Sequence, residues 1–211
     1  MRIKFEQGIS EYAHIYENVF IGQNVTIFPG AVIGRPPLSS GAARKIDLDN
    51  LPPLIIEDGC VIGSNAVIYG GSKIGKNSMI CDNASIREFV SIGDNSLIAM
   101  GVTINRDTQI GNNVKIMDNT HITGNAVIED NVFIGMLVTM ANDNTMNRSK
   151  LSLDQMKGPT IRYGARIGQG ACLLPGIEIG KESIVAANSV VTKDVPEYKT
   201  AMGVPAKIIN I

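Results

Sequence analysis

The residues in this chain whose side chains are best suited to catalysis lie 18 positions apart. His121 stands 18 residues after Thr103, which stands 18 residues after Ser85. A neutral imidazole has a pKa near working pH, so His121 can accept the proton that an attacking amine or hydroxyl loses. Ser85 could relay that proton or bind an acceptor. The spacing predicts a general base among hydroxyls, although an exposed histidine on a polar face needs no function.

Charged and amide residues accompany this series. A second series with steps of 18 comprises Glu88, Arg106, Gly124 and Asn142. Its last member, Asn142, lies near the start of the segment MANDNTMNR. Glu88 and Asp94 could orient the imidazole or hold the amino group of an acceptor, and Asn142 and Asp143 could bind the same acceptor. Solvated charges at turns would have the same pattern, so these four substrate-binding residues are hypotheses.

A shorter repeat of six residues explains the spacing of 18. An aliphatic residue occupies every sixth position from Ile56 to Met140, and the same period runs from Ile9 to Ile33 and from Ile161 to Val191. A period of six suits neither an α-helix nor a hairpin meander. Three hexads can instead close one triangular coil, with one aliphatic residue buried on each side. Residues 18 apart then stack on one face.

The residue before each buried aliphatic should point outward, which predicts three columns of outward side chains. The first column comprises Val67, Ser85, Thr103, His121 and Thr139; the second comprises Lys73, Ser91, Gln109 and Val127; the third comprises Val61, Met79, Leu97, Lys115 and Phe133. The third column is mostly apolar. We expect it to form a subunit contact.

Two segments break the repeat. The first segment, residues 35–53, carries four prolines. The second segment, residues 142–159, includes most of MANDNTMNR. Insertions in solenoids gather on one working surface, so both are candidate ligand walls, or loops that merely tolerate length. Residues 192–211 leave the repeat and are expected to cap the open end.

The composition agrees with a slender β structure. Hydrophobic residues make up 44% of the 211 residues, but aromatic residues only 5%, with no Trp and 22 Gly, so the core must use thin β-branched side chains. The formal net charge of -1 predicts no attraction to nucleic acid or to an anionic membrane. No apolar run has the length of a signal peptide or membrane span. We therefore expect one cytoplasmic domain, residues 1–211.

The repeat resembles that of the hexapeptide-repeat acyltransferase superfamily, and the resemblance covers nearly the whole chain. It implies an all-β, left-handed parallel β-helix; the handedness comes from the resemblance, because general rules favour right-handed crossovers. The stretches 115–148 and 158–208 look like bacterial sugar acyltransferases. The NDN motif at the start of the second insertion is similar to that of enzymes that acylate amino sugars attached to nucleotides.

The resemblance implies a homotrimer that transfers an acyl group from acetyl-CoA or another acyl-CoA to a dTDP- or UDP-linked amino sugar. The amine would attack the thioester directly, with His121 as the base. The acceptor would sit against the face of Ser85 and His121. Small residues would line the pantetheine path and lysines would meet the CoA phosphates: Gly135, Ala141, Ala165, Ala186, Lys193 and Lys207.

Other functions stay open. An O-acetyltransferase of a sugar, serine or xenobiotic hydroxyl would use the same base, and a β-helix can also be a non-catalytic scaffold. The γ-class carbonic anhydrases share the fold but bind zinc through three histidines, whereas this chain has two, His14 and His121. Three widely spaced cysteines indicate neither disulfides nor a cysteine metal site. No metal is therefore predicted.

Overall fold

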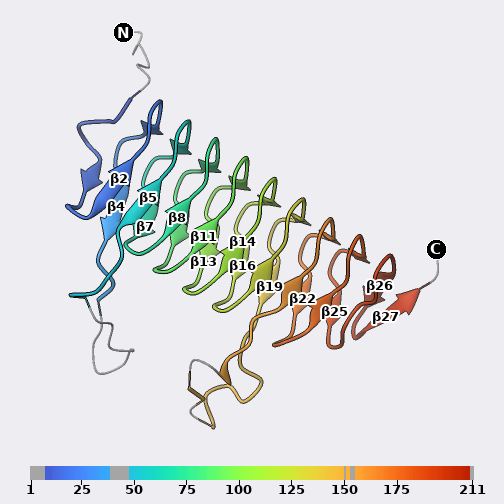
Figure 1. Cartoon of the computed structure of the whole chain (residues 1–211). Helices are drawn as coiled ribbons and strands as arrows, with labels where there is room; N and C mark the ends of the chain where they lie inside the picture. The colour runs from blue at the N-terminus through green and yellow to red at the C-terminus, as the bar shows by residue number, and fades with distance from the viewer. Residues whose placement is uncertain (1–7, 39–47, 150, 153–154, 210–211) are drawn as a thin grey trace.

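The computed structural model describes residues 8–38, 48–149, 151–152 and 155–209. The chain winds into a stack of three-sided coils, and parallel strands from successive coils form three long sheets along the sides (Figure 1). The all-β, left-handed parallel β-helix predicted from the repeat is confirmed. Over the described ranges, no helix has the length and apolar character needed to cross a membrane.

The strands are short, mostly two residues each. The first sheet contains β1 (His14–Ile15), β4 (Val32–Arg35), β7 (Val67–Tyr69), β10 (Ser85–Ile86), β13 (Thr103–Ile104), β16 (His121–Ile122), β19 (Thr139–Met140), β22 (Cys172–Leu173) and β25 (Val190–Val191). The second sheet contains β2 (Val19–Ile21), β5 (Leu54–Ile56), β8 (Lys73–Ile74), β11 (Ser91–Ile92), β14 (Gln109–Ile110), β17 (Val127–Ile128), β20 (Thr160–Ile161) and β23 (Glu178–Ile179).

The third sheet contains β3 (Thr26–Ile27), β6 (Val61–Ile62), β9 (Met79–Ile80), β12 (Leu97–Ile98), β15 (Lys115–Ile116), β18 (Phe133–Ile134), β21 (Arg166–Ile167), β24 (Ile184–Val185), β26 (Thr200–Gly203) and β27 (Ala206–Ile209). β26 still pairs in parallel with β24, whereas β27 folds back antiparallel to β26. The last described residues therefore first extend the third sheet and then close it with a hairpin.

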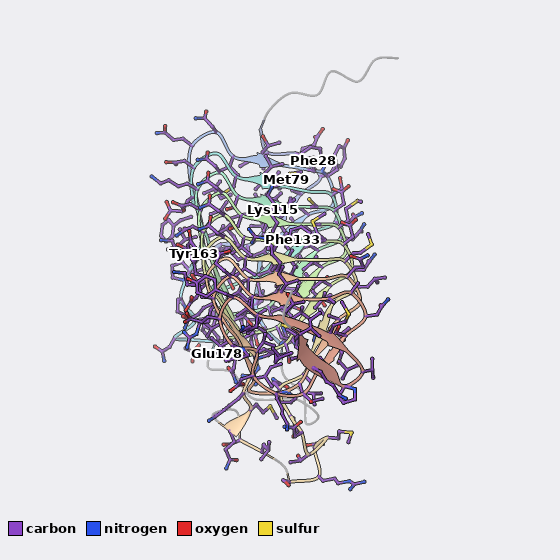
Figure 2. All side chains as sticks on the ribbon, turned by 90° about the vertical axis from the view of Figure 1, so that its right-hand side faces the viewer. Phe28, Met79, Lys115, Phe133, Tyr163 and Glu178 are labelled. Atoms are coloured by element: carbon purple, nitrogen blue, oxygen red, sulfur yellow. The ribbon has the colours of Figure 1, made fainter. Side chains whose placement is uncertain are left out.

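The register of these sheets follows the repeat. The second residue of each central strand is buried in the prism, as for Ile86, Ile104 and Ile122, and the residue before it points outward. The predicted columns are present: Thr103 pairs with Ser85 on one side and with His121 on the other. Figure 2 shows the third column, in which Met79, Lys115 and Phe133 lie one below another.

Both interruptions of the repeat leave the prism along the same edge, between the first and second sheets (Figure 1). We call this the first edge. The first interruption lies between β4 and β5, and the second between β19 and β20. Residues 39–47 of the first, and residues 150, 153 and 154 of the second, lie outside the described residues. The two insertions thus flank a stretch of one edge.

Buried hydroxyls hold the turns between coils. Ser96 donates a hydrogen bond to the carbonyl oxygen of Gly111 (3.0 Å) and accepts one from the backbone N–H of Val114 (3.0 Å). Ser78 makes the equivalent pair of bonds one coil earlier, to Gly93 and from Ser96. Each hydroxyl satisfies backbone groups of the next coil that would otherwise be buried without partners.

Replacing Ser96 with Ala should lower the free energy of unfolding by about 1–3 kcal/mol, because it strands a buried N–H and a carbonyl. Urea denaturation monitored by circular dichroism measures the change. Ser91→Ala is the matched control, since Ser91 is exposed on the second sheet and should change stability by less than about 0.5 kcal/mol. Equal effects in the two variants would contradict the role of the hydroxyl.

Candidate active site

His121 is half-buried on β16 and has a hydroxyl partner on the neighbouring strand. Its Nδ1 lies 2.8 Å from Oγ1 of Thr103. Burial lowers the pKa of the imidazole, because the charged form loses hydration. When Nδ1–H donates to the threonine hydroxyl, Nε2 carries the free lone pair and can accept a proton. The partner that orients the imidazole is therefore Thr103, and not Glu88 or Asp94 as the sequence suggested.

Ser85 stands two strands away from His121 in the same column, with Thr103 between them. Two strand spacings amount to about 10 Å, which is too far for a direct hydrogen bond. Within one chain, Ser85 can therefore reach the imidazole only through Thr103 or a bound molecule.

Glu88 is completely buried and does not face solvent. Its two carboxylate oxygens accept hydrogen bonds from Nε (2.8 Å) and Nη2 (3.1 Å) of Arg87. The guanidinium of Arg87 also lies 5.0 Å from the ring centre of Tyr69. This corrects the expectation that Glu88 binds substrate: a sealed carboxylate holds Arg87 in place instead. Arg87 and Tyr69 were missed, although they are also 18 residues apart.

Asp94 lies on the edge between the second and third sheets, across the prism from the sheet of His121. Its Oδ1 accepts a hydrogen bond from the backbone N–H of Lys76 (2.8 Å), and its own N–H donates to Asn112 (2.8 Å). Asp94 thus supports the stacked turns. One chain does not bring it to His121.

Asn142 and Asp143 begin the second insertion on the first edge. Asn142 Nδ2 donates to the carbonyl oxygen of Gly124 (3.3 Å). Asp143 accepts hydrogen bonds from the Thr145 hydroxyl (2.7 Å) and from the backbone N–H groups of Thr145 (2.6 Å) and Asn147 (2.7 Å). These bonds, led by the Thr145 hydroxyl, lower the pKa of Asp143. Its carboxylate shapes the loop, while Asn142 rests on the coil of His121.

The four small residues predicted along the pantetheine path lie on three different edges. Gly135 and Ala186 follow β18 and β24 on the edge between the third and first sheets. Ala165 precedes β21, and Ala141 follows β19 on the first edge. One chain therefore does not align all four. Gly135 borders the sheet of His121, and a Cβ added there would lie 2.6 Å from the backbone N of Gln169, so this surface requires glycine.

Lys193 and Lys207 are both exposed near the C-terminal end of the prism. Lys193 follows β25, which is three strand steps from β16, or about 15 Å. The structure leaves both lysines accessible. Their contact with CoA phosphates stays a prediction.

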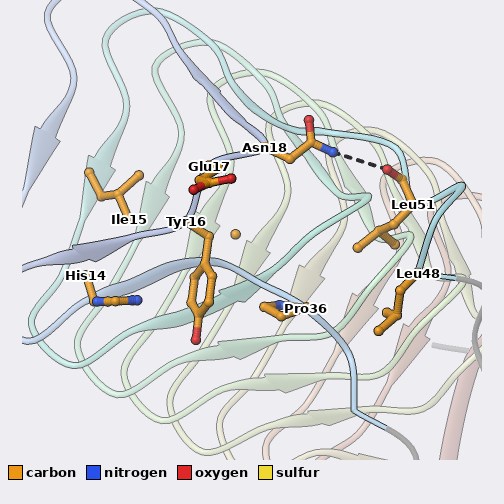
Figure 3. Close-up of a pocket in the computed structure, with 9 residues that line it drawn as sticks. His14, Ile15, Tyr16, Glu17, Asn18, Pro36, Leu48 and Leu51 are labelled. Carbon is orange, nitrogen blue, oxygen red and sulfur yellow. Dashed lines mark hydrogen bonds between the residues drawn. The ribbon is translucent and has the colours of Figure 1, made fainter.

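His14 lines a separate pocket near the N-terminal end, shown in Figure 3. The pocket measures about 470 Å³ and is also lined by Tyr16, Pro36, Leu48 and Leu51, among others. β1 is five strand steps from β16 in the first sheet, or about 24 Å, so His14 does not join His121 within one chain. The described part of the chain holds no cluster of three His, Cys, Asp or Glu side chains suited to a metal ion.

Comparison with known families identifies the repeat. The model of the bacterial transferase hexapeptide family (six repeats) matches residues 53–87, 71–106 and 107–142. The model of the hexapeptide repeat of succinyl-transferase matches residues 164–193. The chain belongs to the hexapeptide-repeat transferase superfamily. The resemblance to this superfamily that the sequence predicted is confirmed, whereas the likeness to enzymes that acylate nucleotide-linked amino sugars stays a prediction.

The similarity of this hexapeptide-repeat protein to individual relatives covers different fractions of the chain. A serine acetyltransferase of Haemophilus influenzae is 54% identical over 52 residues, which cover 25% of this chain and 20% of that protein. LpxA of Bacteroides fragilis, a UDP-N-acetylglucosamine acyltransferase, is 25% identical with a TM-score of 0.77, covering 96% of this chain and 74% of that one. The Vibrio cholerae hexapeptide acetyltransferase VCA0836, complexed with acetyl-CoA, is 25% identical with a TM-score of 0.50, covering 61% and 70%.

The imidazole of His121 should titrate below the ordinary histidine value of about 6.5, because burial disfavours its charged form. Nitrogen chemical shifts measured by NMR across a pH series report both the pKa and the tautomer. Thr103→Val should change the nitrogen shifts of His121, because Nδ1 loses its hydroxyl partner, whereas Thr139→Val, on the other side of His121, should not. A midpoint at or above 6.5 in the wild type would contradict the structure.

Proposed function

We propose that this protein transfers an acyl group, acetyl or another short one, from acyl-CoA to the amino group of a nucleotide-linked sugar. The observation that carries the proposal is the half-buried His121, whose Nδ1 is paired with Thr103 on a flat polar face. Relatives named as acyltransferases, one of them complexed with acetyl-CoA, support the reaction class. The chain spans only 20% and 31% of the length of two serine acetyltransferases that it matches. The proposed activity is therefore argued from the geometry of this chain.

The reaction is direct attack. The amine nitrogen forms a bond to the thioester carbonyl carbon, the C–S bond breaks, and the CoA thiolate leaves. Thr103 orients the imidazole through Nδ1, and in the tautomer whose Nδ1–H donates to Thr103, Nε2 of His121 takes the proton that the nitrogen loses. Since a thioester is already activated, positioning of the two substrates suffices and no acyl-enzyme is required.

The proposed active form is a homotrimer. The third sheet exposes apolar side chains to solvent, including Met79, Phe133 and Ile184. The edge between the third and first sheets adds Met100 and Leu137, of which Leu137 is 58% exposed. Exposed apolar surface of this kind is typical of subunit contacts. A second copy packed here would stand beside the sheet of His121 and could complete the site.

Replacing His121 with Asn or Ala should lower kcat by on the order of a hundredfold or more at saturating substrates, because the proton acceptor is lost. Release of free thiol from acyl-CoA, followed with a thiol reagent, measures the rate. His14→Asn is the matched control, because the other histidine lies near the far end of the same sheet. A loss below about threefold in kcat would instead favour Ser85 or the substrate itself as the proton acceptor.

Replacing Ile184 with Glu should dissociate the trimer, because burial of a carboxylate costs several kcal/mol. Sedimentation velocity is the measurement, and the molar mass of the wild-type species should be three times the chain mass of 22.6 kDa. Gln109→Glu, on the exposed face of the second sheet, should leave the assembly intact. A wild-type monomer would contradict the proposal outright.

A second function is favoured by a specific observation, the 54% identity to a serine acetyltransferase over 52 residues. In that case, the acceptor would be a hydroxyl, and serine or a sugar hydroxyl would replace the amine. Thiol release measured with dTDP- and UDP-linked amino sugars, the matching hydroxyl sugars and serine separates the two functions. If acetyl-CoA at millimolar concentration does not even raise the melting temperature, the chain is better described as a non-catalytic scaffold.

A further inference from the structure

The first edge carries cationic and amide side chains on successive coils, between the two insertions. Tyr69, Arg87 and Asn105 follow one another in steps of 18 on this edge, and Arg35 pairs with Tyr69 one coil earlier. They lead into a cleft of about 290 Å³. The cleft is lined by Arg87, Asn105, Arg106, Gly124, Asn125, Asn142 and Met156.

The arginines of this edge are held in place before any ligand binds. Glu88, fully buried, grips Arg87 through two hydrogen bonds, and the ring of Tyr69 lies 5.0 Å from Arg87 and 5.3 Å from Arg35. Arg106 forms an ion pair with Asp107 (3.1 Å), and its side chain is only 20% exposed. A guanidinium fixed in this way loses little conformational entropy when it binds an anion.

The wall and the floor of the cleft are also built. Asn125 Nδ2 donates to the carbonyl oxygen of Met156 (2.8 Å), which ties the returning end of the second insertion to the coil of His121. Gly124 forms a floor without a side chain: a Cβ there would lie 3.1 Å from the carbonyl oxygen of Arg106 and 3.5 Å from Asn142 Nδ2. The result is a recess with two arginines and three amides, a set rich in hydrogen-bond donors.

We propose that this cleft binds the diphosphate of the nucleotide-linked acceptor, an inference that rests on the proposed function. Glu88 occupies Nε and Nη2 of Arg87, so the N–H groups of Nη1 are the ones that can face a phosphate. The guanidinium of Arg106 adds further donors, and amide N–H groups complete such a site. Gly124 follows His121 by three residues, so the Cα atoms of these two residues are at most about 10 Å apart. That separation leaves room for one sugar ring between the diphosphate and the reacting amine.

CoA also contains a diphosphate, so the source of the anion has to be distinguished. Lys193 and Lys207, the lysines predicted to meet the CoA phosphates, are exposed near the C-terminal end. Lys193 follows β25, three strand steps from the coil of His121, or about 15 Å. The cleft on the first edge is thus separate from that end, which favours the acceptor as its ligand.

Isothermal titration of the full-length protein with UDP, dTDP and acetyl-CoA tests the assignment. Arg106→Gln should weaken binding of the preferred nucleoside diphosphate at least about tenfold and leave acetyl-CoA binding within about twofold. Arg87→Gln combined with Glu88→Gln should act similarly, without leaving a buried carboxylate unpaired. Lys76→Gln is the control, since it removes one positive charge from the edge opposite the first sheet.

The outcomes separate this inference from the proposed function. Unchanged nucleotide binding in Arg106→Gln, or no binding of UDP, dTDP or pyrophosphate to the wild type at millimolar concentration, overturns the diphosphate site even if amino-sugar acylation is established. Weakened acetyl-CoA binding with intact nucleotide binding also overturns it, in favour of the CoA diphosphate. Arginine-dependent nucleotide binding without any acyl transfer supports the site and contradicts the proposed reaction.

Discussion

The burial of one aliphatic side chain at every sixth position is the constraint on which the rest of this structure depends. Ile86, Ile104 and Ile122 are fully buried. A register shift of one residue in any coil would expose such a side chain to solvent. Exposing one of them costs about 1.5–3 kcal/mol, so the coils cannot change register. The stacking of Thr103 against His121 follows directly, because each outward residue is fixed by its buried neighbour.

The edges bear the conformational cost of this winding. Each coil turns through a residue with left-handed backbone dihedral angles, and most such positions hold Asn or Gly, for example Asn83 and Asn119. Several described residues depart from this rule, and Phe89 and Leu137 are two large apolar examples, at a cost of order 1–3 kcal/mol each. Phe89 is compensated within the chain, since a Cβ on Gly71 would lie 3.1 Å from its ring. Leu137 is mostly exposed and has no such burial, which agrees with a contact to a second subunit.

The sequence predicts the prism and its columns almost completely, because a strict period leaves one register. It also locates His121 among hydroxyls and places Asn142 on the first edge. The role of Glu88 was missed because a buried charge depends on its partner, Arg87, and neither periodicity nor composition reveals that pairing.

Counting in steps of 18 also fails across the second insertion. Val127 pairs with Thr160, so the loop adds 15 residues, and loop length is weakly constrained by energy. The alignment of Ala165 and Ala186 with earlier coils therefore could not be read by arithmetic alone. Asp94 illustrates a different limit: its position on the opposite edge follows from the register, but a carboxylate that supports a turn looks the same in sequence as one that binds a ligand.

The lowered pKa of His121 bears on the choice between an amine and a hydroxyl acceptor. Burial keeps the imidazole neutral and available near neutral pH, but it also makes His121 a weaker base. When an amine attacks a thioester, its nitrogen becomes positively charged and strongly acidic as the bond forms, so a weak base suffices. A hydroxyl must give up its proton to become a good nucleophile, and it gains more from a stronger base. A neutral imidazole is thus compatible with both acceptors, and the requirement for a strong base is what distinguishes the hydroxyl from the amine.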